Sequence, residues 1–254
     1  LELKPETSKS INLGVVFEPA PWLNGSVDYW EINRKNQITE LGLSTLVANY
    51  ALFPQNFIRD ASGALVAIDG RWVNAGETST KGIDLSLRAN TALMAGKLSM
   101  TLDGTYLLER KFRLLAGGKF GENQVGKFSA EGDVPVRWKH TLAFSYAQGP
   151  WTGTISNYYV TGYLDRVAPG IANGTVTPSQ YNPNVKAYST YNLSATYTGF
   201  AKTSISAGIK NVLNTNPPFS AAYDADLGAG SSWEPRLTDP RGRAFWLSMS
   251  YSFK

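Results

Sequence analysis

The stretch that decides the fold class is Phe245-Trp246-Leu247-Ser248-Met249-Ser250-Tyr251-Ser252-Phe253. Every second residue, beginning with Phe245 and ending with Phe253, is large and apolar. The residues between them are Trp246 and three serines. A period of two predicts a β-strand with one apolar face and one mostly polar face.

The same alternation recurs along the whole chain, and helical periodicity is scarce. In most of these segments the polar positions hold Ser, Thr, Asn, Arg or Asp. The pattern predicts an all-β, antiparallel up-and-down sheet of about nine strands. The expected strands cover residues 8–18, 24–34, 67–90, 97–112, 136–147, 151–163, 188–198, 203–212 and 243–253. The segment 67–90 is longer than the roughly 9–11 residues with which a strand crosses a membrane, so in a membrane protein we expect it either to project well beyond the bilayer or to break near Gly76.

Alternation alone fits two kinds of protein. In a soluble sandwich the polar face would meet bulk water, and in a membrane barrel it would line a wet lumen while the apolar face met lipid. The lengths of the connections between strands distinguish the sandwich from the barrel, because short and long connections alternate strictly. The short connections cover residues 19–23, 91–96, 148–150 and 199–202, and the long ones cover residues 35–66, 113–135, 164–187 and 213–242. Long loops argue against a compact sandwich, and this alternation is typical of outer-membrane barrels.

The aromatic residues support a membrane barrel. One group lies at the short-turn ends of the strands, namely Trp22, Tyr146, Trp151, Tyr197, Phe200 and Phe253. A second group lies at the opposite ends, namely Tyr29, Trp30, Tyr158, Tyr159, Tyr163, Tyr188, Phe245 and Trp246. Two aromatic belts at the two membrane interfaces are expected of such a barrel.

Composition excludes several functions. The 254 residues include no cysteine, which excludes a disulfide scaffold, a thiolate zinc site and a cysteine nucleophile. They include one histidine, His140, which excludes the usual metal site of two or three histidines. The net charge of +4 is too weak to indicate nucleic-acid binding. His140 lies on the apolar parity of its strand, which favours a wall role over a ligand role. Asp224 and Asp226 lack the downstream glutamate of a calcium loop. We therefore predict no enzyme, no metal site and no cofactor.

Five segments, in order, resemble a known family. They are Leu3-Lys4-Pro5-Glu6-Thr7-Ser8, Val27-Asp28-Tyr29-Trp30-Glu31-Ile32, Val73-Asn74-Ala75-Gly76-Glu77 with Gly82-Ile83-Asp84, Gly208-Ile209-Lys210-Asn211-Val212-Leu213-Asn214, and Asp239-Pro240-Arg241-Gly242-Arg243. On these residues the chain resembles the C-terminal part of the β-barrel of TonB-dependent outer-membrane receptors. The resemblance covers nearly the whole chain.

The resemblance implies a 22-stranded barrel, of which residues 1–254 would supply about strands fourteen to twenty-two. The plug domain and the TonB box would then lie outside this chain. It also implies a location in the bacterial outer membrane and active uptake of a ferric siderophore, cobalamin, haem or an oligosaccharide. The implied partners are outer-membrane lipid, the TonB complex, the barrel-assembly machinery and the small nutrient, with no nucleic acid.

Two groups of residues are candidates for functional roles. The last long loop carries Phe219, Tyr223, Trp233, Arg236 and Arg241. Rings with arginines suit a flat anionic chelate, and they suit a sugar almost as well. Alternatively, these residues pack loop against loop, and Arg241 or Arg243 lines the lumen.

The second group is Tyr251 and Phe253, which resemble the C-terminal signal for barrel assembly, although Lys254 follows the aromatic. Alternatively, these two residues simply face lipid. Two other protein classes remain open on the sequence, namely a passive outer-membrane porin and a soluble all-β carbohydrate-binding protein.

Overall fold

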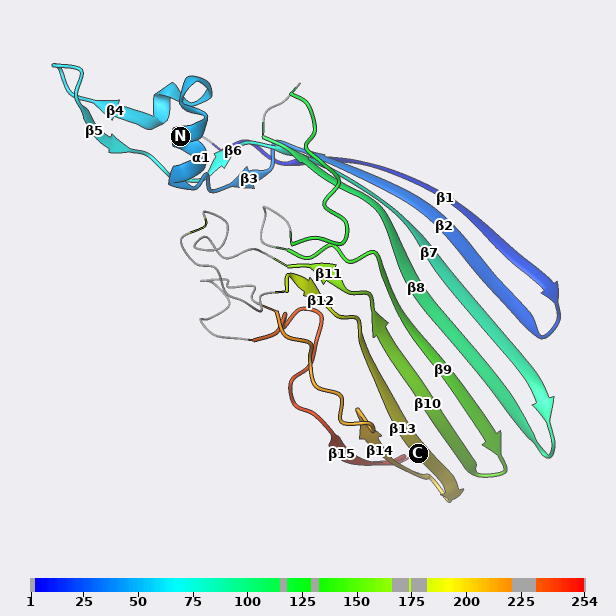
Figure 1. Cartoon of the computed structure of the whole chain (residues 1–254). Coiled ribbons are helices and arrows are strands. Elements are labelled where there is room, and N and C mark those ends of the chain that lie inside the picture. The colour runs from blue at the N-terminus through cyan, green and yellow to red at the C-terminus, as the bar shows by residue number, and fades with distance from the viewer. Residues whose placement is uncertain are drawn as a thin grey trace. The chain divides into compact units, whose positions relative to one another are not determined.

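The structure is a computed structural model, and it describes residues 3–114, 118–128, 133–165, 174, 182–220 and 232–253. Nine strands form one sheet in which neighbours along the chain are also neighbours in the sheet (Figure 1). Their order is β1 (Thr7–Ala20), β2 (Leu23–Lys35), β7 (Glu77–Leu93), β8 (Gly96–Arg113), β9 (Trp138–Gln148), β10 (Trp151–Val160), β13 (Tyr188–Phe200), β14 (Thr203–Lys210) and β15 (Ala244–Tyr251). This confirms the predicted up-and-down sheet and its number of strands.

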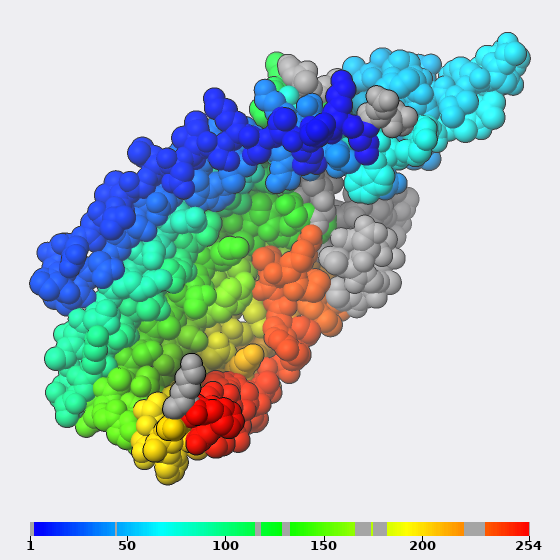
Figure 2. Space-filling model, turned by 180° about the vertical axis from the view of Figure 1, so that it is seen from behind, coloured from blue at the N-terminus to red at the C-terminus, as the bar shows by residue number. Residues whose placement is uncertain are grey.

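The chain divides into two compact units. The first contains residues 1–11, 31–80 and 110–123, and the second contains residues 12–30, 81–109 and 124–254. The second unit includes part of all nine strands. Figure 2 shows its green, yellow and red strands, β8 to β15, following one another side by side.

Strand register gives the sheet of the second unit two chemically distinct faces. Met100, Phe144, Ile155, Leu193, Ile209 and Phe245 are directly paired from β8 to β15. We call their side the apolar face. Thr152, Thr196, Ser206 and Ser248 form a paired row on the opposite side, which we call the polar face. The Thr196 and Ser206 hydroxyl oxygens lie 2.9 Å apart. Because paired residues share a side, one polar–apolar alternation extends across the sheet.

Glycines make room for large rings on neighbouring strands. A Cβ at Gly104 would lie 2.2 Å from the Trp138 ring on the apolar face. On the polar face, a Cβ at Gly208 would lie 2.5 Å from the Trp246 ring. A side chain at either position would displace its tryptophan, so the glycines are explained by close packing.

The first unit contains a small core within the long connection after β2. Its elements are β3 (Ile38–Thr39), α1 (Leu43–Ala48), η1 (Tyr50–Leu52), η2 (Pro54–Asn56), β4 (Phe57–Arg59), β5 (Leu65–Ile68) and β6 (Val73–Asn74). β3 pairs with β6, and β4 pairs with β5. Leu41, Leu46, Phe53 and Ala75 are buried together. The connection expected at residues 35–66 therefore has structure of its own.

The segment 67–90 breaks near Gly76, which confirms one of the two expectations for it. Its residues belong to β5, β6 and β7 and not to one strand. Gly76 has a φ of +96°, which side chains rarely tolerate, and a Cβ there would lie 2.6 Å from the Phe112 ring. A turn at Asp69 and Arg71, joined by an ion pair of 2.6 Å, ends β5.

The second unit has its own buried cluster near the long connections. Val136, Val160, Tyr163, Val185 and Tyr188 form it, with Leu237 packed against it. The two short strands β11 (Tyr163–Leu164) and β12 (Asn184–Val185) pair there.

Within the described ranges, no helix is both long enough and apolar enough to span a membrane.

Candidate functional site

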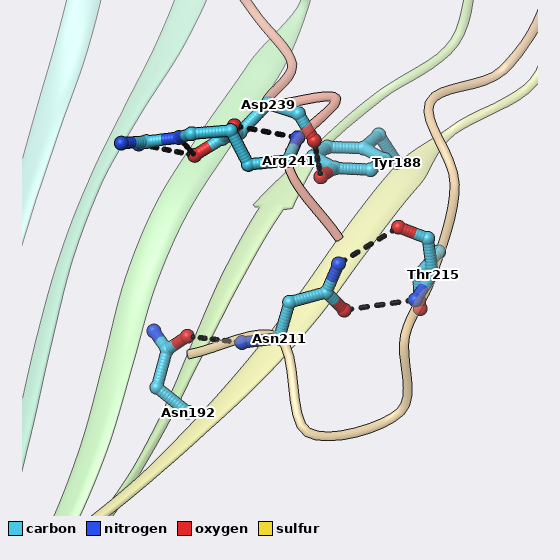
Figure 3. Close-up of polar contacts among 6 residues, drawn as sticks. All are labelled: Tyr188, Asn192, Asn211, Thr215, Asp239 and Arg241. Carbon is cyan, nitrogen blue, oxygen red and sulfur yellow. Dashed lines mark hydrogen bonds and ion pairs between the residues drawn. The ribbon is translucent and has the colours of Figure 1, made fainter. Parts of the chain in front are cut away.

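Residues 232–243, which we call the strap, lie against the polar face of β10 and β13. The Tyr158 hydroxyl donates to the Leu237 carbonyl at 3.4 Å. The Tyr188 hydroxyl donates to the Asp239 carbonyl at 3.2 Å, as Figure 3 shows. Since Leu237 also packs on the buried cluster, both polar and apolar contacts hold the strap in place.

The strap contains two ion pairs between residues two positions apart. Glu234 is buried and accepts from Arg236 Nε at 2.6 Å and from Nη2 at 2.9 Å. Asp239 accepts from Arg241 Nε at 2.9 Å and from Nη2 at 2.6 Å. In each pair the carboxylate also accepts the backbone N–H of the arginine. Such two-point pairs fix the geometry of the turn as well as balancing its charge.

The ion pair has a clear effect on Asp239. The hydrogen bonds from the Arg241 side chain, followed by the one from its backbone, lower the pKa of Asp239 from 3.8 to about 2. The carboxylate of Asp239 therefore stays ionised at any physiological pH. The Arg241 side chain is 76% exposed, so part of its guanidinium faces open space beside the strap.

Asn211 secures the loop that leads into the strap. Its backbone has a φ of +49°, and its side chain exchanges two hydrogen bonds of 2.8 Å with the backbone of Thr215 (Figure 3). The Asn211 backbone N–H donates to the Asn192 side chain at 2.9 Å. An amide side chain can replace a peptide group in this way, which closes a tight turn after β14.

The other end of the loop is fastened to the same turn. The Arg243 backbone N–H donates to the Asn214 side chain at 2.9 Å, and its Nε donates to the Val212 carbonyl at 3.0 Å. Gly242 has a φ of +66°, and a Cβ there would lie 2.9 Å from the Asn214 oxygen. Asn211, Gly242 and Arg243 thus fix the base of the loop.

A cavity of about 520 Å³ lies between the strap and the polar face. It is lined by tyrosine and tryptophan rings, amides, hydroxyls and cations. The lining residues include Tyr158, Tyr188, Thr190, Asn192, Lys210, Arg236, Arg241 and Trp246. Phe245 and the carboxylate of Asp239 line it as well. Three cations and four rings beside open space suit an anionic ligand that has flat or apolar parts.

The structure brings together some of the loop residues predicted from the sequence. Arg236 and Arg241 both line the cavity, whereas Phe219 and Trp233 are not among the described residues that line it. Phe219 is 65% exposed. Tyr223 lies outside the described residues. The sequence analysis missed Lys210 and the role of Tyr158 and Tyr188 in holding the strap. The alternation in β10, β13 and β14 could have indicated them, because all three residues occupy polar-face positions.

The remaining motif residues support the backbone. The Asn74 side chain donates to the carbonyls of Lys4 and Asn36 at 2.7 and 2.9 Å. A Cβ at Gly82 would lie 2.4 Å from the Trp30 ring. Asp84 accepts from the Thr105 hydroxyl at 2.8 Å.

Two further motif residues lie in β2. The Asp28 carboxylate fills the space beside Gly14, and Tyr29 is half-buried. Within the residues that the structure describes, no three acidic or histidine side chains are grouped to hold a metal ion.

The apolar face is exposed, and rings border it at the short turns. Trp151 and Tyr197 have ring centroids 4.6 Å apart, and Tyr197 and Phe200 have centroids 5.1 Å apart. Leu247 is 76% exposed in the middle of β15. An exposed apolar face, a polar face that carries the strap, and rings at the strand ends define a wall segment of a membrane β-barrel.

Comparison with known proteins gives the family. The family model described as TonB dependent receptor-like, beta-barrel matches residues 2–212. The chain therefore belongs to the TonB-dependent receptor β-barrel family, and its location is the outer membrane. No curated protein sequence matches it.

Solved structures of low sequence identity share the fold. The ferric enterobactin receptor PfeA of Pseudomonas aeruginosa is 20% identical, with a TM-score of 0.65 over 99% of this chain and 32% of that one. The outer membrane transporter YddB of Escherichia coli is 17% identical, with a TM-score of 0.63 over 99% and 33%. The FrpB iron transporter of Neisseria meningitidis is 15% identical, with a TM-score of 0.61 over 98% and 32%. The chain thus spans about a third of the length of these structures.

Proposed function

We propose that the chain supplies part of the wall and several loops of an outer-membrane receptor that takes up a scarce nutrient with energy from the TonB complex. The family is one of transporters and receptors, which supports this proposal. Within this function, the cavity under the strap is the proposed point of contact with the nutrient. The observation that carries this assignment is that cations lie beside aromatic rings in the lining of this cavity. The cations are Lys210, Arg236 and Arg241, and the rings include Tyr158, Tyr188 and Trp246.

We propose an anionic ferric chelate as the nutrient. Two of the similar structures are named as a ferric enterobactin receptor and an iron transporter, which supports iron. The cavity supports the same choice, because its cations can pair with chelate oxygens while its rings stack on a flat ligand. Cobalamin, haem and an oligosaccharide are the other outcomes that the experiments can reveal.

Uptake of a labelled ferric chelate by whole cells, with and without a functional TonB complex, tests the mode of transport. We expect binding in both strains and accumulation only in the strain with TonB. A passive porin would accumulate the chelate equally in both, and that result would exclude active uptake.

Alanine substitutions test the contact. Arg241→Ala is expected to weaken chelate binding by about 10- to 100-fold, the loss of one hydrogen bond to a charged group. Arg71→Ala is the matched control, because Arg71 forms the same two-point pair with Asp69 in the other unit. If Arg241→Ala, Arg236→Ala and the unmodified protein bind the chelate with equal affinity, the cavity does not contact the nutrient.

A further inference from the structure

The three cations that line the cavity under the strap differ in how they are paired. The strap's own carboxylates accept from two nitrogens of Arg236 and from two nitrogens of Arg241, and Figure 3 shows the Arg241 pair. The ammonium group of Lys210 has no carboxylate within ion-pair distance among the described residues. Of the three cations, Lys210 therefore carries the charge that a ligand need not share.

Strand register places Lys210 on the cavity side of the sheet. Lys210 ends β14 and pairs directly with Ala244 of β15, and both residues line the cavity. The hydrogen bonds from Arg241 lower the pKa of Asp239 most, and the charge of Lys210 lowers it further. The field of Lys210 thus reaches the strap across the cavity, and an anion between them meets this charge.

A tryptophan ring lies beside Lys210 on the same face. Trp246 pairs directly with Gly208, which is two residues before Lys210 on β14. The ring lies across Gly208, where a Cβ would be 2.5 Å from the indole nitrogen, and Trp246 is 37% exposed. Two residues along a strand span about 7 Å, so one flat ligand can contact the ring and the ammonium group together.

The paired arginines can still donate hydrogen bonds to a ligand. Asp239 accepts from Nε and Nη2 of Arg241, and a guanidinium has further N–H groups that can reach an uncharged ligand oxygen. A second full negative charge is less favourable beside Arg241. It would compete with the Asp239 carboxylate, which is ionised above its pKa of about 2 and repels a like charge.

We propose that the cavity selects a flat ligand with a single anionic group, which Lys210 binds while the flat part stacks on Trp246. The ligand class is a planar monocarboxylate, or a chelate that presents one such group. Two or three carboxylates are disfavoured because, in the described part of the cavity, Lys210 alone offers an unshared charge. This inference rests on the proposed function, in which the cavity contacts the nutrient, and it makes Lys210 and Trp246 determinants of specificity.

The test is binding of three probes that share one benzene ring and differ in charge, namely benzoate, isophthalate and trimesate, with one, two and three carboxylates. Ligand-observed nuclear magnetic resonance measures their affinities for the protein as the cell makes it, purified in detergent. The unmodified protein is expected to bind benzoate several-fold more tightly than trimesate. Lys210→Met should weaken benzoate binding by about tenfold, the loss of one hydrogen bond to a charged group, whereas Lys210→Arg should retain it.

Two further variants test the parts of the proposal separately. Asp239→Asn removes the carboxylate that pairs with Arg241, so it should strengthen isophthalate binding several-fold while leaving benzoate binding unchanged. Trp246→Leu keeps an apolar side chain but removes the stacking surface, so it should weaken benzoate binding by about fivefold.

Lys139→Met is the matched control, because Lys139 is an exposed lysine on the polar face of β9 that does not line the cavity. We expect it to leave benzoate binding unchanged, and heat-modifiable gel mobility checks that every variant is folded. Equal benzoate binding by Lys210→Met and Lys139→Met would overturn the proposal, as would trimesate binding as tight as that of benzoate. If Arg241→Ala still weakened binding of the ferric chelate in either case, the proposed function would stand without this specificity.

Discussion

At the residue scale, three arginines of the loops each form an ion pair with the acidic residue two positions before them. The pairs are Asp69 with Arg71, Glu234 with Arg236, and Asp239 with Arg241. In all three, one carboxylate accepts both the backbone N–H and the guanidinium of the arginine. An acid two positions before an arginine in a loop is thus a sequence signal for a fixed turn. An anionic ligand at Arg236 or Arg241 would share a guanidinium that is already paired.

The pair at Asp239 predicts how the strap responds to pH. Its folded pKa of about 2 lies below the ordinary 3.8, so its contribution to stability is present above pH 3.8 and is lost as the pH falls through 2. The protection of the strap amides, measured as the exchange rate relative to the intrinsic rate at each pH, should therefore fall between pH 4 and pH 2. Asp239→Asn, measured in parallel, should lose this pH dependence. An identical loss of protection in both proteins would assign the effect to another group.

At the element scale, the sequence predicted the strands well because alternation is a local property. The nine strands of the sheet were all anticipated, and most ends differ by a few residues. The exception was 67–90, where the break depends on the close approach of Gly76 to Phe112, a contact that alternation does not report. The strap was beyond prediction for the same reason. Tyr158 and Tyr188 reach carbonyls at residues 237 and 239, which are distant in sequence.

A prediction at the same scale concerns the glycines beneath the rings. Gly104→Val should destabilise the folded protein by about 1–3 kcal/mol, because the new side chain overlaps the Trp138 ring. Gly153→Val is the control on the same face, since a Cβ at Gly153 has no atom within 4 Å. Urea unfolding followed by heat-modifiable gel mobility measures both. If Gly153→Val destabilised the protein as much as Gly104→Val, a general effect of replacing glycine in a strand, and not overlap with the Trp138 ring, would explain the loss of stability at Gly104.

At the scale of the whole molecule, the sheet has two edges, at β1 and β15. Unpaired backbone groups are not tolerated within lipid, so both edges require partner strands in the membrane. The solved structures that share the fold are about three times as long as this chain. Correct pairing of β15 is therefore a step on which assembly of the whole wall depends.

That dependence leads to a prediction for the end of the chain. Phe253 is 92% exposed, and its ring contacts Tyr251 edge-on with centroids 5.0 Å apart. Such a ring contributes little to packing of the folded sheet, so its loss should affect recognition during assembly more than final stability. Deletion of Phe253 should lower the amount of folded protein in the outer membrane several-fold while leaving its unfolding midpoint unchanged. Phe245→Ala, which removes another exposed ring, at the start of β15, should leave the amount unchanged. Equal levels of the unmodified and Phe253-deleted proteins would show that the terminal ring only faces lipid.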